Sequence, residues 1–176
     1  MNVVYVLNNW KSRFRGTIVM PGARGGNSHP CAIGRGGMTA CKKEGDGSTP
    51  IGRYRALEVY YRPDRVTRPI TRLPIRQISK KMGWCDATFD RNYNREVELP
   101  YSASHEKMTR DDHLYDLVVV LDYNIKQRTQ GTGSAIFFHL AHPDFRATEG
   151  CVAVQERVMR MFLKQATTNT VLDIQP

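Results

Sequence analysis

The sequence predicts a mainly β protein. Apolar residues recur mostly at every second position, the spacing of a strand with one buried face, rather than at the 3.6-residue spacing of a helix. Glycine-rich segments separate these runs, as turns do in β domains. The chain has 176 residues, enough for one domain with a proper hydrophobic core. We therefore expect residues 1–176 to form a single domain.

The alternating pattern places the strands. They are expected at residues 3–7, 16–20, 54–61, 96–99, 117–122, 135–139, 151–154 and 171–174. Residues 155–166 predict the main helix, because Val158, Met161, Phe162 and Gln165 fall at helical spacing. Weaker patterns predict short helices within 76–81 and 104–110.

Residues 61–101 predict a long excursion from the sheet rather than a second domain. Four prolines and many charged residues interrupt any periodic pattern there. Loops of this length in compact domains usually bind ligands or act as lids. We expect aromatic residues such as Tyr61 and Trp84 to line a groove for an extended ligand, although packing on the sheet would explain each of them as well.

Charge and composition limit the classes of partner. The formal net charge is +9, which favours anionic partners such as acidic wall polymer, anionic lipid or nucleic acid. A basic surface without a dedicated partner explains the charge equally well. No apolar run approaches the roughly 20 residues of a membrane-spanning helix, and the N-terminus shows no signal-peptide pattern.

Four cysteines are too few for a disulfide scaffold, and no Cys-x-x-Cys pair indicates structural zinc. Their spacing leaves a bridge between Cys31 and Cys41 open as an alternative to free thiols.

One stretch carries candidate chemistry. An apolar run ends on His139, a turn with Pro143 and Asp144 follows, and a second apolar run begins at Gly150 and Cys151. If the runs are neighbouring strands, an imidazole can activate the thiol as a nucleophile. The glycine leaves backbone N–H groups of Gly150 and Cys151 for an oxyanion hole. By themselves, a buried cysteine and a core histidine are the commoner explanation.

A zinc site is the main alternative at the same stretch. His139, His142 and Cys151, with Glu149, have permissible ligand types. The helical His-Glu-x-x-His frame is absent, and strand spacing separates the histidines.

Two blocks of sequence resemble the YkuD-type L,D-transpeptidases. Residues 43–54, with Thr49-Pro50-Ile51-Gly52, are similar to that family's Thr-Pro-x-Gly-x-aromatic element. Residues 136–139 and 148–152 resemble its histidine followed by Ser/Thr-His-Gly-Cys. The two blocks in this order, with a β-rich span between them, are fairly specific.

The resemblance implies an L,D-transpeptidase-like β-sandwich or barrel with short helices packed on it. It implies a peptidoglycan enzyme of the periplasm or cell wall that forms 3,3 or 1,3 stem-peptide cross-links through a cysteine thioester, with no metal or organic cofactor. Cys151 would be the nucleophile, His139 its base, and Gly150 an oxyanion donor. Thr148 would take the place of the family's Ser/Thr, and the Thr49 turn would support the site.

The sequence also departs from the family pattern. Glu149 stands where many members have histidine, Ala153 where many have arginine, and the interval from His139 to Cys151 is short. Donor and acceptor preference are therefore open, and an L,D-carboxypeptidase or endopeptidase is the alternative reaction. We expect substrate contacts from Thr148, Glu149, His142, Arg146, Trp84 and Tyr61, no nucleic-acid partner and a monomer. The rival from another class is a polyanion-binding domain without catalysis.

Overall fold

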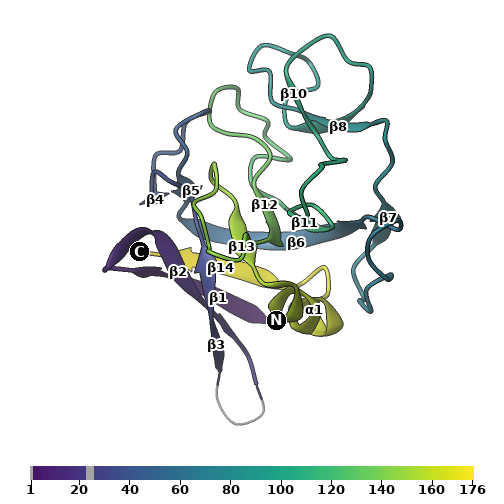
Figure 1. Cartoon of the computed structure of the whole chain (residues 1–176). Helices are drawn as coiled ribbons and strands as arrows, with labels where there is room; N and C mark the ends of the chain where they lie inside the picture. The colour runs from purple at the N-terminus through teal and green to yellow at the C-terminus, as the bar shows by residue number, and fades with distance from the viewer. Residues whose placement is uncertain (1, 23–25) are drawn as a thin grey trace.

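The computed structural model describes residues 2–22 and 26–176. Its strands are β1 (Val3–Asn9), β2 (Ser12–Met20), β3 (Asn27–Ala32), β4 (Met38–Thr39), β5 (Thr49–Pro50), β6 (Gly52–Tyr61), β7 (Ile75–Gln77), β8 (Met82–Cys85), β9 (Arg95–Glu98), β10 (His105–Lys107), β11 (Leu117–Leu121), β12 (Phe137–Leu140), β13 (Val152–Val154) and β14 (Val171–Gln175). A helix, α1 (Glu156–Gln165), lies between β13 and β14. The predicted mainly β class is confirmed (Figure 1).

Nine strands form the main sheet, in the order β11-β12-β13-β3-β2-β1-β14-β6-β7. The long strand β6 also pairs with β11, so the sheet closes on itself as a barrel-like shell. β6 pairs with β14 through its first residues and with β11 through its later ones. Closure leaves few free strand edges and brings the C-terminal half of the chain beside the N-terminal strands.

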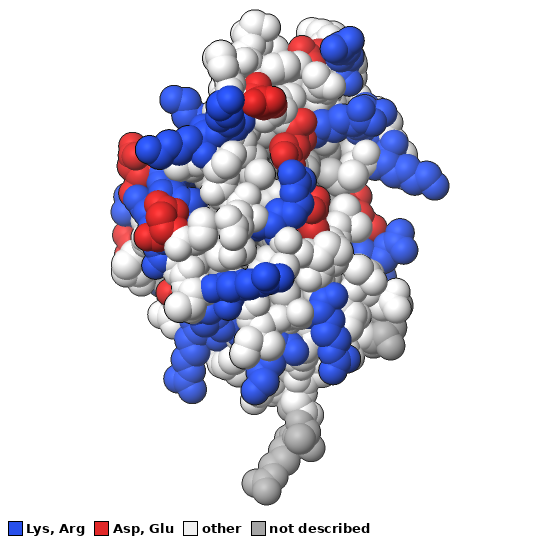
Figure 2. All heavy atoms as spheres, turned by 90° about the vertical axis from the view of Figure 1, so that its right-hand side faces the viewer, with Lys and Arg blue, Asp and Glu red and all other residues white. Residues whose placement is uncertain are grey.

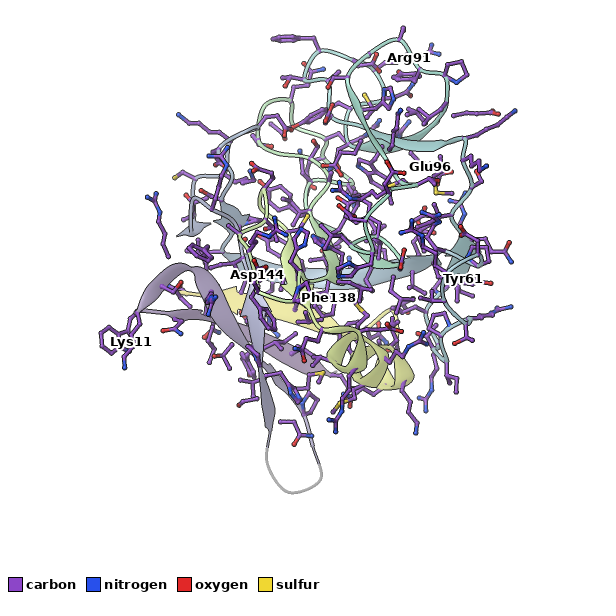
Figure 3. All side chains as sticks on the ribbon, viewed as in Figure 1. Lys11, Tyr61, Arg91, Glu96, Phe138 and Asp144 are labelled. Carbon is purple, nitrogen blue, oxygen red and sulfur yellow. The ribbon has the colours of Figure 1, made fainter. Side chains whose placement is uncertain are left out.

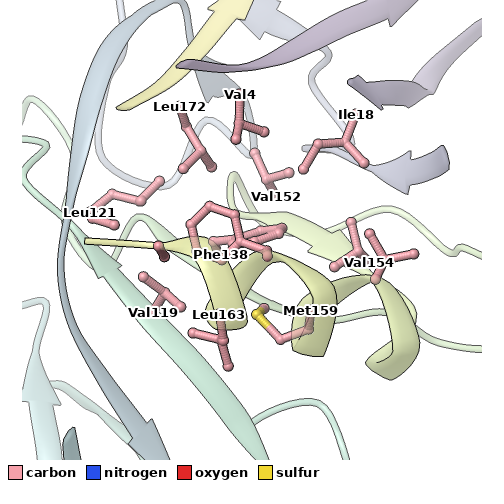
Figure 4. Close-up of a cluster of buried hydrophobic side chains, with 14 of the residues drawn as sticks. Val4, Ile18, Val119, Leu121, Phe138, Val152, Val154, Met159, Leu163 and Leu172 are labelled. Carbon is pink, nitrogen blue, oxygen red and sulfur yellow. The ribbon is translucent and has the colours of Figure 1, made fainter. Parts of the chain in front are cut away.

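The core lies between the shell and α1 (Figure 4). The helix buries Val158, Met159, Phe162 and Leu163, and the ring of Phe162 meets that of Phe138 in β12 edge to face at 5.0 Å. Each fully buried side chain of this size contributes about 1.5–3 kcal/mol. This packing fixes β12 and β13, the strands that carry the candidate site.

The excursion at 61–101 builds structure of its own. β8 pairs with β9 and with β10 in a three-stranded sheet, which packs on the main sheet through Trp84, Tyr115 and Phe137. The rings of Trp84 and Phe137 lie 5.1 Å apart, edge to face. This shared apolar cluster favours the one-domain organisation that the sequence predicts.

Most predicted elements are confirmed within a few residues, including α1 and the strands of the main sheet. The two short helices are wrong. Residues 76–81 complete β7 and turn into β8, and residues 105–107 form β10. Each segment buries a single apolar residue, Ile78 or Met108, too few for an amphipathic helix, and pairs with a neighbouring strand instead.

Strand β3 was not predicted because Ser28, His29 and Pro30 give it no apolar alternation. It pairs with β2 over its whole length but with β13 only at Ala32. Pro30 therefore lies where one edge of the strand is unpaired, and its missing N–H is tolerated there.

No helix of the described residues is long and apolar enough to span a membrane.

Candidate active site

The predicted neighbours His139 and Cys151 do lie on adjacent strands. β12 and β13 pair in parallel, with Phe138 opposite Val152 and His139 opposite Ala153. Cys151 comes immediately before β13. Because the two strands run in the same direction, the segment that joins β12 to β13 is a crossover connection and not a hairpin turn.

Both side chains line one pocket of about 230 Å³. One wall consists of residues 139–142 and 146–149 with Cys151 and Ala153. Glu106, Arg110, Leu114 and Tyr115 also line this pocket. A larger hollow of about 580 Å³ lies elsewhere, between Arg53–Leu57 and the 122–132 segment, and contains neither the thiol nor the imidazole.

The Cys151 thiol is held by the backbone of the segment that enters β12. The residue is 7% exposed. Sγ–H donates to the Ala135 carbonyl at 3.2 Å, and Sγ accepts the Phe137 N–H at 3.3 Å. Burial raises the pKa of the thiol to about 12, and the negative charge of Glu106 adds to the rise. The hydrogen bond from the Phe137 N–H lowers the pKa of this thiol, but by less. In the resting protein the group is therefore a neutral thiol.

His139 has a defined tautomer. Its Nδ1 lies 2.8 Å from the carbonyl oxygen of Leu140, and because a carbonyl only accepts, Nδ1 carries the proton and Nε2 is left as an acceptor. Burial lowers the pKa of His139 to about 4. The ring of Tyr115 packs against the imidazole at 5.2 Å. The imidazole is thus neutral and can accept a proton at neutral pH.

The thiol does not form a hydrogen bond with the imidazole in this structure. The sulfur instead bonds to the Ala135 carbonyl, on the segment that enters β12, and to the Phe137 N–H at the first residue of β12. The expected direct contact therefore requires the thiol to leave the Ala135 carbonyl.

Gly150 has a structural role that the sequence did not reveal. Its φ is +135°, and a Cβ at this position would lie 2.8 Å from the Ser48 carbonyl oxygen. Its N–H donates to Thr148 Oγ1 at 3.1 Å, so the prediction that this group is a free oxyanion donor needs correction. The Cys151 N–H makes no hydrogen bond within the described part of the chain and is the remaining donor.

Two threonines support the backbone at Cys151. Thr148 Oγ1 donates to the Cys151 carbonyl at 2.7 Å, and the buried Thr49 hydroxyl approaches the same oxygen at 3.4 Å. Thr49 Oγ1 also accepts the Gly34 N–H at 2.8 Å. The Thr49 turn therefore lies directly behind the candidate nucleophile, in the supporting position that the sequence predicts.

Glu149 lies at the pocket wall and pairs with an arginine that sequence reasoning missed. Arg35 Nε is 2.9 Å from Glu149 Oε2, and both side chains are largely exposed. The backbone N–H of Arg35 also donates to the Thr148 carbonyl at 2.8 Å. No sequence signal foretold this partner, because Arg35 stands in a glycine-rich turn 114 residues away.

His142 and Arg146 line the pocket, as predicted. They contact each other, with Arg146 Nη2 3.3 Å from His142 Nδ1, and Arg146 also forms an ion pair with Asp144 at 3.2 Å.

Trp84 and Tyr61 are not in the pocket, which corrects their prediction as substrate contacts. Both are buried. Trp84 packs on Phe137 and donates its indole N–H to Asn94 at 3.0 Å. Tyr61 ends β6 beside β7, well away from Asp144 in the β12–β13 connection (Figure 3). Their aromatic surface serves the core rather than a ligand.

The zinc arrangement does not form. Within residues 2–22 and 26–176, no group of three or more His, Cys, Asp or Glu side chains is placed to hold a metal ion. All four cysteines are free thiols, including Cys31 and Cys41.

The closed sheet defines a mainly β domain with one pocket that holds a thiol and an imidazole. The family model of the L,D-transpeptidase catalytic domain (YkuD) matches residues 4–174. The chain belongs to this family, as its two sequence blocks indicate.

Among solved structures, the chain is similar to the helical cell shape determining protein Pgp2 from Campylobacter jejuni, with 14% identity and a TM-score of 0.46. The alignment covers 99% of this chain and 48% of that one, so the chain spans about half the length of this relative. No curated protein sequence matches the chain.

Proposed function

We propose that this protein is a cysteine-dependent L,D-transpeptidase that cross-links peptidoglycan stem peptides through a thioester. The observation that carries the proposal is the shared pocket of Cys151 and His139, with Nδ1–H of the imidazole bound to the Leu140 carbonyl and Nε2 available as a base.

The reaction starts when the thiol leaves the Ala135 carbonyl and passes its proton to His139 Nε2. Sγ then bonds to the carbonyl carbon of an L-configured residue in the donor stem, and the Cys151 N–H stabilises the oxyanion. The C–N bond breaks, and the leaving D-amino acid takes the proton from His139. An amine of a second stem attacks the thioester, forms the cross-link and restores the thiol.

Water in place of the acceptor amine would make the protein an L,D-carboxypeptidase or endopeptidase. The pocket supports this second candidate because it is small, about 230 Å³, and the space left for an acceptor stem is limited. Glu149 lines this pocket and is paired with Arg35, so an acceptor that enters there would lie near this ion pair.

The cell wall is the proposed place of action. The net charge of +9 suits an anionic wall. On the face in Figure 2, Lys and Arg side chains are spread widely and are interspersed with Asp and Glu in the upper part. A dispersed pattern favours general attraction to polyanions over a dedicated nucleic-acid groove. The noncatalytic rival predicts salt-dependent nucleic-acid binding that Cys151→Ala leaves unchanged.

Intact-mass spectrometry tests the proposal. The protein is incubated with tetrapeptide muropeptides, or with a carbapenem as an acylating mimic of the donor. We expect a covalent adduct with the unchanged chain and none with Cys151→Ala, and Cys41→Ser, which removes an exposed thiol, should keep the adduct. No adduct and no cross-linked or trimmed product would overturn the proposal. The ratio of dimer to trimmed monomer distinguishes transfer from hydrolysis.

A further inference from the structure

The excursion at 61–101 reaches the segment that enters β12 through two adjacent side chains, those of Tyr93 and Asn94. These residues immediately precede β9, and each is only 1% exposed. Neither lines the pocket of Cys151, and the chemistry above gives them no role. Their polar atoms nevertheless bind the backbone N–H groups of Gly133 and Ala135.

The side chain of Asn94 joins three separate parts of the chain. Its Oδ1 accepts the Ala135 N–H and the indole N–H of Trp84, each at 3.0 Å. Its Nδ2 donates to the Tyr123 carbonyl at 3.1 Å. Two donors at one end and an acceptor at the other define the orientation of the amide. Because the amide is buried, its removal would leave the Ala135 N–H without this partner.

Tyr93 holds the same segment two residues earlier. Its hydroxyl accepts the Gly133 N–H at 3.1 Å and donates to Glu44 Oε2 at 2.5 Å. The Ser134 hydroxyl donates to the same carboxylate oxygen at 2.8 Å. Each of residues 133, 134 and 135 is therefore bound to a side chain from a distant part of the chain.

Ala135 connects these contacts to the thiol. Its φ of +51° is unfavourable for a residue with a Cβ, and such a conformation persists only where the surroundings hold it. Its N–H is bound by Asn94, and its carbonyl accepts the Cys151 Sγ–H at 3.2 Å. If Ala135 relaxed to a negative φ, its N–H and carbonyl would lose their present relative orientation, and the carbonyl would no longer meet the sulfur.

We propose that Asn94 is a positioning residue for the thiol: by holding Ala135 in its positive-φ conformation, it keeps the Ala135 carbonyl against Cys151. Tyr93 supports the same arrangement through Gly133. The excursion thereby acts on the candidate nucleophile without contacting it. The inference rests on the proposed function in so far as it treats Cys151 as the nucleophile, but the contacts themselves require no substrate.

The positioning has a chemical consequence. A hydrogen bond from S–H to a carbonyl stabilises the neutral thiol, whereas the Phe137 N–H, which donates to the same sulfur at 3.3 Å, stabilises the thiolate. Loss of the first bond with the second retained should therefore favour the thiolate. Asn94 is in this way expected to keep the resting thiol protonated.

Asn94→Gly tests the inference in the ligand-free protein. Glycine readily adopts the φ of +56° found at Asn94, so the substitution removes the amide without straining the backbone. We expect the S–H stretching band of Cys151, isolated as the infrared difference between each protein and its Cys151→Ala counterpart, to shift towards that of an unbonded thiol. Iodoacetamide at about pH 8 should alkylate Cys151 at least about threefold faster than in the unchanged chain. An unchanged band or an unchanged rate in the folded variant would overturn the inference.

Asn124→Gly is the matched control. Asn124 also has a positive φ, of +51°, and its side chain also binds backbone groups of this loop, at Thr129 and Gly133. It forms no hydrogen bond with Ala135 among the described residues. We expect its S–H band and alkylation rate to match those of the unchanged chain. Equal shifts in Asn124→Gly and Asn94→Gly would show general loosening of the loop and would overturn the inference.

Tyr93→Phe provides a milder variant should Asn94→Gly fail to fold. It removes only the hydroxyl between Gly133 and Glu44, and we expect a smaller shift of the S–H band in the same direction. Circular dichroism and melting temperature establish that each variant is folded. If Asn94→Gly does not fold, an unchanged band in folded Tyr93→Phe would overturn the inference.

The outcomes separate the two proposals. A shifted band and faster alkylation in Asn94→Gly, without any thioester from muropeptides in the unchanged chain, would leave the positioning role intact and overturn the transpeptidase reaction. A thioester in the unchanged chain, with a Cys151 band that Asn94→Gly does not alter, would do the reverse.

Discussion

The Cys151 thiol donates to the Ala135 carbonyl at 3.2 Å instead of to His139, although the two side chains share a pocket. Ala135 has a φ of +51°, an uncommon conformation for a residue with a side chain, and Asn94 Oδ1 holds its N–H at 3.0 Å. The thiol of the candidate nucleophile is thus bound to a fixed backbone group, and its side chain must rotate before it can contact His139.

Cys151 should react slowly with alkylating agents in the absence of substrate. Because burial and Glu106 raise the pKa of its thiol to about 12, the thiolate is scarce at pH 7 and increases up to the alkaline limit. Iodoacetamide labelling followed by mass spectrometry between pH 6 and 10 measures this, with the exposed Cys41 as internal control. An inflection near pH 7 for Cys151 in the free protein would contradict the expectation.

His139 should retain its base function to unusually low pH. Its pKa of about 4 keeps Nε2 unprotonated at pH 5–6, so turnover should fall only as the pH approaches 4, not near the ordinary 6.5. His139→Gln should lower kcat by at least about a hundredfold. A pH–rate profile that breaks near 6.5 would show a solvated imidazole instead.

The free energy of unfolding should decrease as the pH is lowered, because His139 is buried in its neutral form. The pKa of His139 is lower in the folded chain than in the unfolded one, so the unfolded chain takes up the proton first as the pH falls below about 6.5. The loss develops between about pH 6.5 and 4 and amounts to roughly 3 kcal/mol. Urea unfolding at pH 7 and pH 4.5 measures it, and in His139→Gln the pH-dependent loss should be smaller by this contribution.

Gly150→Ala should be strongly destabilising. The added Cβ would lie 2.8 Å from the Ser48 carbonyl oxygen, at a φ of +135°. We expect a loss of about 3 kcal/mol or more in the free energy of unfolding. Gly45→Ala is the control, since Gly45 also has a positive φ but its added Cβ would meet nothing within 4 Å; it should lose only about 1 kcal/mol. Similar losses in denaturant titrations of both variants would refute the contact with Ser48.

The pair formed by Arg35 and Glu149 should affect reaction preference more than stability. Both side chains are more than half exposed, and such pairs contribute about 0–1 kcal/mol. Glu149→Gln and Arg35→Gln should therefore leave the melting temperature nearly unchanged while altering the ratio of cross-linked to trimmed product. A double-mutant cycle with a coupling well above 1 kcal/mol would contradict this.

Much of the fold could be predicted because most strands of the main sheet are either alternating or continuous apolar runs. β11 and β12 are buried, apolar runs, and α1 has one clear apolar face. β8, β9 and β10 are short and depend on pairing with each other for their structure, so propensity could not locate all of them. The pairing of β6 with β11, which closes the sheet, could not be predicted either, because it joins segments that are far apart in the sequence.

The proximity of the candidate pair was predictable because His139 lies in β12 and Cys151 immediately precedes β13, and these two strands are neighbours. The positions of Glu106 and Arg35 were not predictable, since Glu106 lines the pocket and Arg35 pairs with Glu149 only through contacts between segments far apart in the chain. The prediction for Trp84 and Tyr61 was wrong for a physical reason. An aromatic side chain in a charged excursion is equally compatible with a ligand groove and with a hydrophobic core, and in this protein both side chains are buried in the core.

The contacts between the Thr49 turn and the Gly150–Cys151 peptide have a consequence for protein engineering. Ser48 leaves no room for a side chain at Gly150, and Thr49 touches the Cys151 carbonyl. A chimera that replaces residues 43–54 alone, or 148–152 alone, with those of a relative would join surfaces shaped for different partners. Grafts between members of the family should therefore exchange both blocks together.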